Sequence, residues 1–294
     1  IEDEVAPTDI LDLAMAAKAS GGKVIVQVKN YVDSASLPRS KVVVPGTCID
    51  AIVVSKDPIN MHRMTPASFY DPVLCGHMRA KDIKLGGAAA LDAKKVIARR
   101  AAMELSPNAV VNLGIGIPEL IANVANEEGI GNEVCLTVEV GMIGGIPSGG
   151  GNFGSSYNAY CALPESSQFD YYNGGNLALA SLGFMEVDEI GNVNASKVGT
   201  KVEGVGGFVD ISQCTPICVF AGTMTAKGLK THIEDGKLVI DQEGVAKKFK
   251  KQVGQISFSG KTSRESGQRC LFVTERCVFQ ITDQGLTLIE IAPG

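Results

Sequence analysis

Apolar positions along the chain change from helical to strand spacing and back, and these changes predict the order of elements. Helical spacing over residues 8–19, behind the N-cap residues Thr8 and Asp9, predicts a first helix. Short apolar runs at 24–28 and 41–44 predict two buried strands. Between residues 56 and 90 no period is sustained and prolines recur, which predicts a connection and places a domain boundary near residue 90.

The stretch after this boundary alternates helical and strand patterns, which is typical of a βαβ unit. The predicted elements are a helix over 93–105 capped by Asp92, a strand over 109–114, a helix from Pro118 to Gly129 and a strand over 134–140. A right-handed crossover makes the two strands parallel, so the pattern predicts an α/β sheet.

Glycine becomes frequent after Gly141, and the last third of the chain has the texture of antiparallel strands. A hairpin is predicted over 229–240 with its turn at Asp235-Gly236, followed by alternating strands over 270–281 and 286–291. These strands are expected to extend or cap the parallel core.

Composition excludes several classes of protein. The 294 residues are 45% hydrophobic with a net charge of -5, which suits a packed globular protein without a basic footprint for nucleic acid or an anionic membrane. No apolar run approaches the length that spans a bilayer and no secretory leader is evident, so a cytoplasmic location is the default expectation. The chain starts at Ile1 without methionine and is expected to be a fragment.

Metal and nucleotide sites are not favoured. The eight cysteines form no CxxC pair and are expected to be reduced core residues, and the three histidines fall in no triad pattern. The turn at 113–118 lacks the third glycine of a dinucleotide fingerprint, because Glu119 stands there. The near-match to a P-loop at 254–262 has one residue too many and no helical pattern after it.

Two glycine turns and one glutamate are the candidates for chemistry. Gly114 and Gly116 either make a tight turn or present backbone N–H groups to an anion or carbonyl at a helix start. Glu139 ends an apolar strand, where a carboxylate is rare unless it is paired or used, although it also fits a strand end that reaches solvent. Burial would raise its pKa, and the carboxylate would suit a base or a nucleophile. Both features fall at carboxyl ends of strands, where α/β sheets bind ligands.

Long segments resemble the family I coenzyme A transferases, above all the single-chain acetate or propionate CoA-transferases with two fused halves. The segments that carry the resemblance are VNLGIGIPELIANVANEEG, LTVEVGMIGGIPSGGGNFGSSYN, FDYYNGGNLALASLGFMEVDEIGNVNASKVGTKVEGVGGFVDIS, FAGTMTAKGLK and FVTERCVF. The resemblance implies an open, mostly parallel sheet with helices on both faces, as in the CoA-transferase/NagB-like fold, with additional antiparallel strands. It assigns residues 1–90 to the tail of a first CoA-transferase domain plus linker, and 91–294 to a second domain that carries the catalytic glutamate.

The resemblance also implies a reaction and its residues. Glu139, in the context Glu-X-Gly-X-X-Gly-Gly, would attack an acyl-CoA carbonyl and then carry CoA as a glutamyl thioester to a carboxylate acceptor. Gly206 and Gly207 match the family's oxyanion pair, and Gly114 and Gly116 match its turn beside the CoA site. Bordering the acyl pocket, the resemblance places Gly144, Gly145, Asn173, Gly174 and Gly175. CoA is a co-substrate, no cofactor or metal is bound permanently, and the expected partners are short-chain acids, the missing first domain and further copies in a homo-oligomer.

Two departures from the family pattern bear on specificity. Val140 stands where relatives usually carry a small residue, and Asn173–Ala178 replaces an acidic Asp-Gly-Gly-Gly-Leu-Asp pattern. Acetate or propionate therefore does not follow as the substrate. The alternatives are an acyl-CoA hydrolase on the same scaffold, a phosphosugar isomerase or sensor, which would lack the long glycine segment, and a non-catalytic fragment or subunit.

Overall fold

The computed structural model describes residues 9–33, 35–83 and 88–293. The chain forms two compact units, the first made of Ile1–Ile83 and Thr137–Asp170, the second of Lys84–Leu136 and Tyr171–Gly294. The predicted boundary near residue 90 lies close to the first change of unit, but the segment around Glu139 clusters with the N-terminal residues. Strand β4 (Cys135–Val138) and helix α5 (Glu165–Asn173) each run from one unit into the other.

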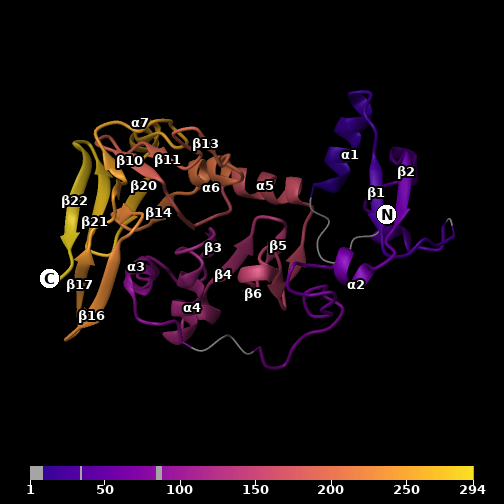
Figure 1. Cartoon of the computed structure of the whole chain (residues 1–294), viewed down its shortest axis with the longest axis horizontal. Coiled ribbons are helices and arrows are strands. Elements are labelled where there is room, and N and C mark those ends of the chain that lie inside the picture. The colour runs from indigo at the N-terminus through magenta and orange to yellow at the C-terminus, as the bar shows by residue number, and fades with distance from the viewer. Residues whose placement is uncertain (1–8, 34, 84–87, 294) are drawn as a thin grey trace. The chain divides into compact units, whose positions relative to one another are not determined.

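The second unit is built on a mixed sheet whose strands follow the order β22-β21-β20-β14-β9-β3 (Figure 1). The central strands β3, β9, β14 and β20 are parallel, and β21 and β22 add to them antiparallel. Their bounds are Val110–Leu113, Leu179–Leu182, Ile217–Ala221, Arg269–Val273, Cys277–Thr282 and Gly285–Ile291. The expected α/β fold with a mostly parallel sheet and added antiparallel strands is confirmed.

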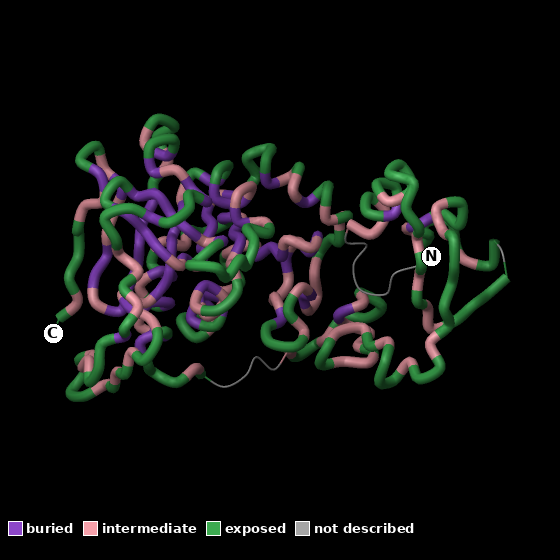
Figure 2. The backbone as a smooth tube through the Cα atoms, turned by 45° about the horizontal axis from the view of Figure 1, so that its top comes forward, coloured by how far each residue is buried: buried purple, intermediate pink, exposed green. Residues whose placement is uncertain are grey.

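Helices cover both faces of this sheet. Figure 1 shows α3 (Ala93–Ala102) and α4 (Leu120–Glu127) on one side, with α6 (Phe208–Cys214) and α7 (Gly260–Glu265) on the other. Alternation along β14 explains the two layers, because Val219 packs in the core shared with α3 and α4 whereas the ring of Phe220 lies 5.9 Å from that of Phe208 in α6. Figure 2 shows the buried residues gathered along these strands.

The second unit also contains shorter strands outside this sheet. They form the ladder β11-β10-β19, the ladder β15-β18 and the hairpins β12-β13 and β16-β17. Their bounds are Glu186–Asp188 for β10, Val193–Asn194 for β11, Lys197–Val198 for β12, Lys201–Val202 for β13, Thr225–Ala226 for β15, Lys230–Glu234 for β16, Lys237–Gln242 for β17, Ala246–Lys247 for β18 and Phe249–Lys250 for β19. The hairpin predicted at Asp235-Gly236 is confirmed, and both turn residues have positive φ.

The first unit contains short elements joined by turns. Helix α1 (Ile10–Ala19) precedes a parallel pair of strands, β1 (Ile25–Val28) and β2 (Ala51–Val54), of which β2 is exposed along its whole length. The glycine-rich part forms β5 (Met142–Ile143), β6 (Ile146–Pro147), β7 (Ser156–Tyr157) and β8 (Cys161–Ala162). Helix α2 (Pro58–Met61) and short 3-10 helices complete the unit.

Several predicted elements differ from the structure. The helices over 8–19, 93–105 and 118–129 and the strands over 24–28, 109–114 and 134–140 are present with slightly shorter bounds, and Thr8 lies outside the described residues. The strand expected at 41–44 is wrong, since β1 pairs with residues 51–54 instead. The strand expected over 270–281 is two strands, because a turn at Thr274–Arg276 reverses the chain. The absence of a helix after residues 254–262 is also wrong: α7 begins at Gly260 with the Ser259 side chain capping the Thr262 N–H.

Candidate active site

Glu139 is the first residue of a tight connection between β4 and β5. Val138 pairs with Met142 across this hairpin, and the Gly141 N–H donates to the Val138 carbonyl at 3.0 Å. Gly141 has a φ of 118°, and a Cβ there would overlap the Leu163 carbonyl oxygen. The backbone of the turn therefore fixes the position from which the Glu139 side chain leaves the strand.

The Glu139 carboxylate is half-buried and has no compensating partner. No hydrogen bond or ion pair joins it to any other residue in the described ranges, and burial raises its pKa above the usual value. Burial, followed by the charges of Asp9 and Glu139, also raises the pKa of Glu165 at the start of α5. A desolvated carboxylate without donors is poised for attack on an electrophile or for accepting a proton.

The raised pKa of Glu139 predicts an unusual stability effect. A proton bound more tightly in the folded state stabilises the fold at low pH, and this contribution is lost as pH rises through the folded pKa. We expect Glu139→Gln to be more stable than the parent at neutral pH, with a difference that shrinks as pH falls towards the ordinary carboxyl pKa of 4.5. Thermal denaturation over a pH series measures it.

Glu127 provides a control of opposite sign. The Lys95 ammonium, 2.6 Å away, lowers the pKa of Glu127. Glu127→Gln should therefore destabilise the protein at neutral pH and lose this effect in acid. A Glu139→Gln variant that is less stable than the parent at neutral pH would contradict the assignment of an uncompensated carboxylate.

The glycines that follow Glu139 have packing roles. Gly144 and Gly145 have φ of 75° and 72°, and a Cβ at either would overlap the Tyr160 ring or the Tyr157 carbonyl. The Ser156 hydroxyl donates to the Gly144 carbonyl at 2.9 Å. Close packing of β5 and β6 on residues 156–160 thus requires glycine at both positions, and their place beside an acyl group stays a prediction.

Gly114 and Gly116 follow β3 at the carboxyl edge of the second unit's parallel strands. The Gly114 N–H donates to the Ser181 carbonyl at 2.9 Å, so this amide joins the turn to β9. Gly116 has a φ of 90° and open space where a Cβ would stand. The positive φ explains the glycine at position 116, and a Cβ at Gly114 would stand 3.3 Å from the Leu182 side chain.

Gly206 and Gly207 lie at the same edge. They directly precede α6, whose first residue Phe208 packs near the end of β14 on Phe220, while the Ser212 carbonyl further along α6 accepts from Cys218 near the start of β14. The helix therefore runs antiparallel to the strand, and its N-terminus faces the carboxyl edge. Within the described part of the chain, the N–H groups of Gly206 and Gly207 have no hydrogen-bond acceptor, which leaves two adjacent donors.

The loop Asn173-Gly174-Gly175 lies at the opposite edge, because it precedes β9. The Asn173 amide donates to Asp210, in the first turn of α6, at 3.1 Å and accepts from the thiol of Cys214, the last residue of α6, at 3.3 Å. The second unit thus brings Gly114, Gly116, Gly206 and Gly207 to one edge and leaves this loop at the other. Its place beside an acyl pocket stays a prediction.

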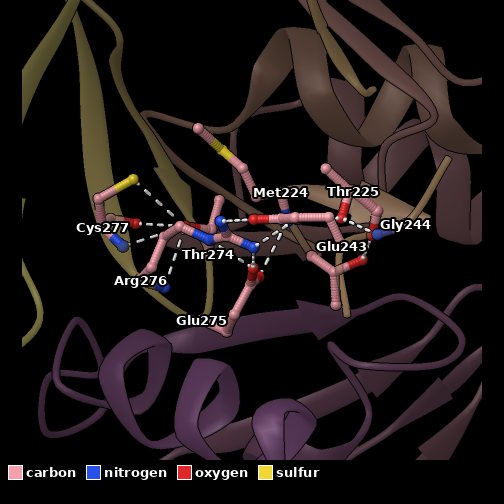
Figure 3. A network of polar contacts seen from close by, with 9 residues as sticks. Met224, Thr225, Glu243, Gly244, Thr274, Glu275, Arg276 and Cys277 are labelled. Atoms are coloured by element: carbon pink, nitrogen blue, oxygen red, sulfur yellow. Dashed lines mark hydrogen bonds and ion pairs between the residues drawn. The ribbon is translucent and has the colours of Figure 1, made fainter. Parts of the chain in front are cut away.

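A buried ion network occupies the carboxyl ends of β14 and β20, and sequence reasoning assigned it no role (Figure 3). The fully buried Glu275 accepts from the Arg276 guanidinium at 2.6 Å and from the Met224 N–H at 2.9 Å. Arg276 also donates to Glu243 at 2.6 Å. The signal in the sequence is the Thr-Glu-Arg run directly after a buried strand, since charged residues there need partners.

The described residues contain no group of three or more His, Cys, Asp or Glu side chains arranged to hold a metal ion. Among the same residues, every helix is too short or too polar to cross a bilayer.

Comparison with known proteins decides the family. The family model for coenzyme A transferase matches residues 94–294. This chain belongs to the coenzyme A transferase family. The match begins at α3 and includes Glu139 and both glycine pairs of the carboxyl edge.

Curated relatives of this chain include enzymes with different acids in their names. It is 45% identical over its whole length to the caffeate CoA-transferase of Acetobacterium woodii, and 44% identical to the acetate CoA-transferase YdiF of Escherichia coli K12. The chain covers 56% and 54% of those proteins, so it spans about half the length of the relatives it matches.

Solved structures agree with the fold. The apoenzyme of the acyl-CoA transferase YdiF from Escherichia coli O157:H7 matches with a TM-score of 0.87 and 42% identity, covering all of this chain and 54% of that one. A second YdiF structure, described as a thioester complex with CoA, has a TM-score of 0.87 and 41% identity over the same extents. Glutaconate coenzyme A-transferase from Acidaminococcus fermentans, with a TM-score of 0.51 and 18% identity over 67% of this chain, shares the fold.

Proposed function

We propose that this protein transfers CoA from a short-chain acyl-CoA to a carboxylate acceptor through a thioester on Glu139. The observation that carries the proposal is the half-buried Glu139 carboxylate, which has no partner among the described residues and a raised pKa. The CoA thioester complex of YdiF, a protein 41% identical to this one, supports a covalent CoA intermediate.

The proposed reaction conserves the energy of the acyl thioester. The Glu139 carboxylate attacks the acyl-CoA carbonyl and expels CoA thiolate, which leaves an acyl-glutamyl anhydride. The thiolate then attacks the glutamyl carbonyl and releases the first acid as its carboxylate. The acceptor carboxylate attacks the resulting glutamyl-CoA, and the same two steps in reverse give the new acyl-CoA and free Glu139.

Two features of the chain suit these steps. Each attack produces an oxyanion, and from the resemblance of their segment to the family we assign its stabilisation to the adjacent N–H donors of Gly206 and Gly207. A half-buried nucleophile also limits the access of water, which would hydrolyse the anhydride and the thioester. Admission of water would make the same residues an acyl-CoA hydrolase.

The class of acid that serves as donor and acceptor is part of the proposal. The named relatives act on acetate and on caffeate, and this chain carries Val140 beside the nucleophile. The proposal also includes a preceding CoA-transferase half, since the relatives are about twice as long, together with a homo-oligomeric enzyme in the cytoplasm.

The test is a mass measurement on the complete protein. It is incubated with acetyl-CoA, propionyl-CoA or butyryl-CoA without an acceptor, digested and analysed for a CoA adduct. We expect the adduct on the peptide that contains Glu139 and not in Glu139→Gln. An enzyme that transfers CoA at full rate without this adduct would refute the mechanism, and thioester loss that needs no acceptor acid would identify a hydrolase.

A further inference from the structure

A buried polar network is hydrogen-bonded to the start of the segment that carries Gly206 and Gly207. Its members come from three stretches of the second unit, namely β10, the segment of β11 and the residues after it, and the segment before α7. They are Glu186, Asn194, Ser196 and Ser257, and none is more than 7% exposed. Buried polar groups at this depth have to satisfy one another.

Asn194 is the centre of the network because its amide group is fully used. The amide nitrogen donates to the Glu186 carboxylate at 2.8 Å and to the Lys197 carbonyl at 2.6 Å. The amide oxygen accepts from the N–H groups of Ser196 and Lys197, each at 3.1 Å. The Asn194 side chain thereby fixes the backbone conformation at Ser196. An ion pair with Lys250 compensates the charge of Glu186.

Ser196 connects Asn194 to the segment that carries Gly206 and Gly207. Its carbonyl accepts from the Glu203 N–H at 2.8 Å and the Gly204 N–H at 3.3 Å. Its hydroxyl accepts from the Gln255 amide at 3.0 Å and the Ser257 hydroxyl at 3.1 Å. The intervening hairpin β12-β13 is exposed, so these bonds at its base hold the start of the segment that leads to Gly206.

We propose that Asn194 is a positioning residue that fixes the Gly206-Gly207 donors through Ser196. The inference rests on the proposed role of those two N–H groups as oxyanion donors. Because donors stabilise an oxyanion only within a narrow range of distance, a small shift of this segment lowers the rate of the chemical steps. Asn194 touches neither CoA nor the acid in this assignment.

Asn192 offers a matched control two residues earlier in the same run. It is also a buried amide, donating to Asp188 at 3.1 Å, but its oxygen accepts from the Gly260 N–H at 3.0 Å. It therefore ties the β10-β11 turn to α7 and makes no bond to residues 196–207. Asn192→Ala and Asn194→Ala remove the same chemical group at similar depth.

The experiment measures hydrogen exchange and steady-state transfer in the complete protein. Asn194→Ala is expected to speed amide exchange in the peptide covering 200–208 and to lower kcat about 10- to 100-fold with little change in KM for acyl-CoA. Asn192→Ala should speed exchange at the start of α7 instead and keep kcat near that of the parent. If Asn194→Ala does not fold, Ser196→Ala replaces it. This variant removes only the hydroxyl group that accepts from Gln255 and Ser257.

The outcomes separate this inference from the proposed function. Unchanged kcat and exchange in both Asn194→Ala and Ser196→Ala overturn the positioning role, as does an equal loss of kcat in Asn192→Ala. If the parent forms no CoA adduct on Glu139, the proposed function fails, and the exchange data alone then support or refute the anchoring of residues 200–208.

Discussion

Replacing Glu139 by glutamine is expected to lower kcat for CoA transfer by at least about 1000-fold, because removal of a covalent nucleophile costs this much or more. A glutamine amide cannot attack the acyl-CoA to form the anhydride. It also cannot leave as a free carboxylate at the end of the reaction. KM for acyl-CoA should change little, since glutamine keeps the volume of the side chain. Initial rates of transfer between acyl-CoA and a labelled acid, with the complete protein, measure the effect.

Glu165→Gln is the matched control for this substitution. Glu165 is another partly buried carboxylate with a raised pKa in the same unit, and its titration senses the charge of Glu139. Glu165→Gln should retain most of the transfer activity, because the proposed chemistry uses Glu139 in the β4-β5 hairpin. Loss of activity in Glu165→Gln with retention in Glu139→Gln would move the nucleophile to α5.

Replacing Glu275 by alanine is expected to lower the free energy of unfolding by about 3–5 kcal/mol, the usual cost of removing one partner from a buried ion pair. The change leaves the Met224 N–H without its acceptor and Arg276 with Glu243 as its remaining carboxylate. Urea denaturation of the complete protein measures this cost.

Glu243→Ala tests the exposed end of the same network. The Glu243 side chain is 54% exposed, and we expect this substitution to cost much less stability than Glu275→Ala, because exposed ion pairs contribute little. Equal costs for Glu275→Ala and Glu243→Ala would show that the buried position of Glu275 does not determine the contribution of the network.

Local signals in the sequence located the elements whose causes are local. Asp92 caps α3 by accepting from the Lys95 N–H, and Gly129 closes the turn after α4 with a positive φ. The choice between residues 41–44 and 51–54 as the partner of β1 was not visible, because both runs are rich in valine and pairing decides between them. The six residues of α7 were likewise too few for a helical period to appear.

The candidate site likewise has features that could be predicted from the sequence and features that could not. Glu139 could be found from an apolar run that ends in a carboxylate before glycine, and the structure places it in the turn directly after β4. The amino-edge position of Asn173 depends on the direction of β9 relative to β3, which residue patterns do not reveal. Glu275 and Glu243 are 32 positions apart, so the network that joins them through Arg276 has no signature in sequence spacing.

The backbone of the β4-β5 turn has a consequence for changing the acids that the proposed reaction would accept. Gly141 has no room for a side chain, whereas Val140 before it contacts the small apolar cluster of Val138 and Met142 and is only half-buried. A combinatorial library that varies Val140 and spares Gly141 would therefore alter the neighbour of Glu139, the proposed nucleophile, without displacing the main chain of the turn. In this turn, Val140 is the position that can change, and Gly141 is the position that must be kept.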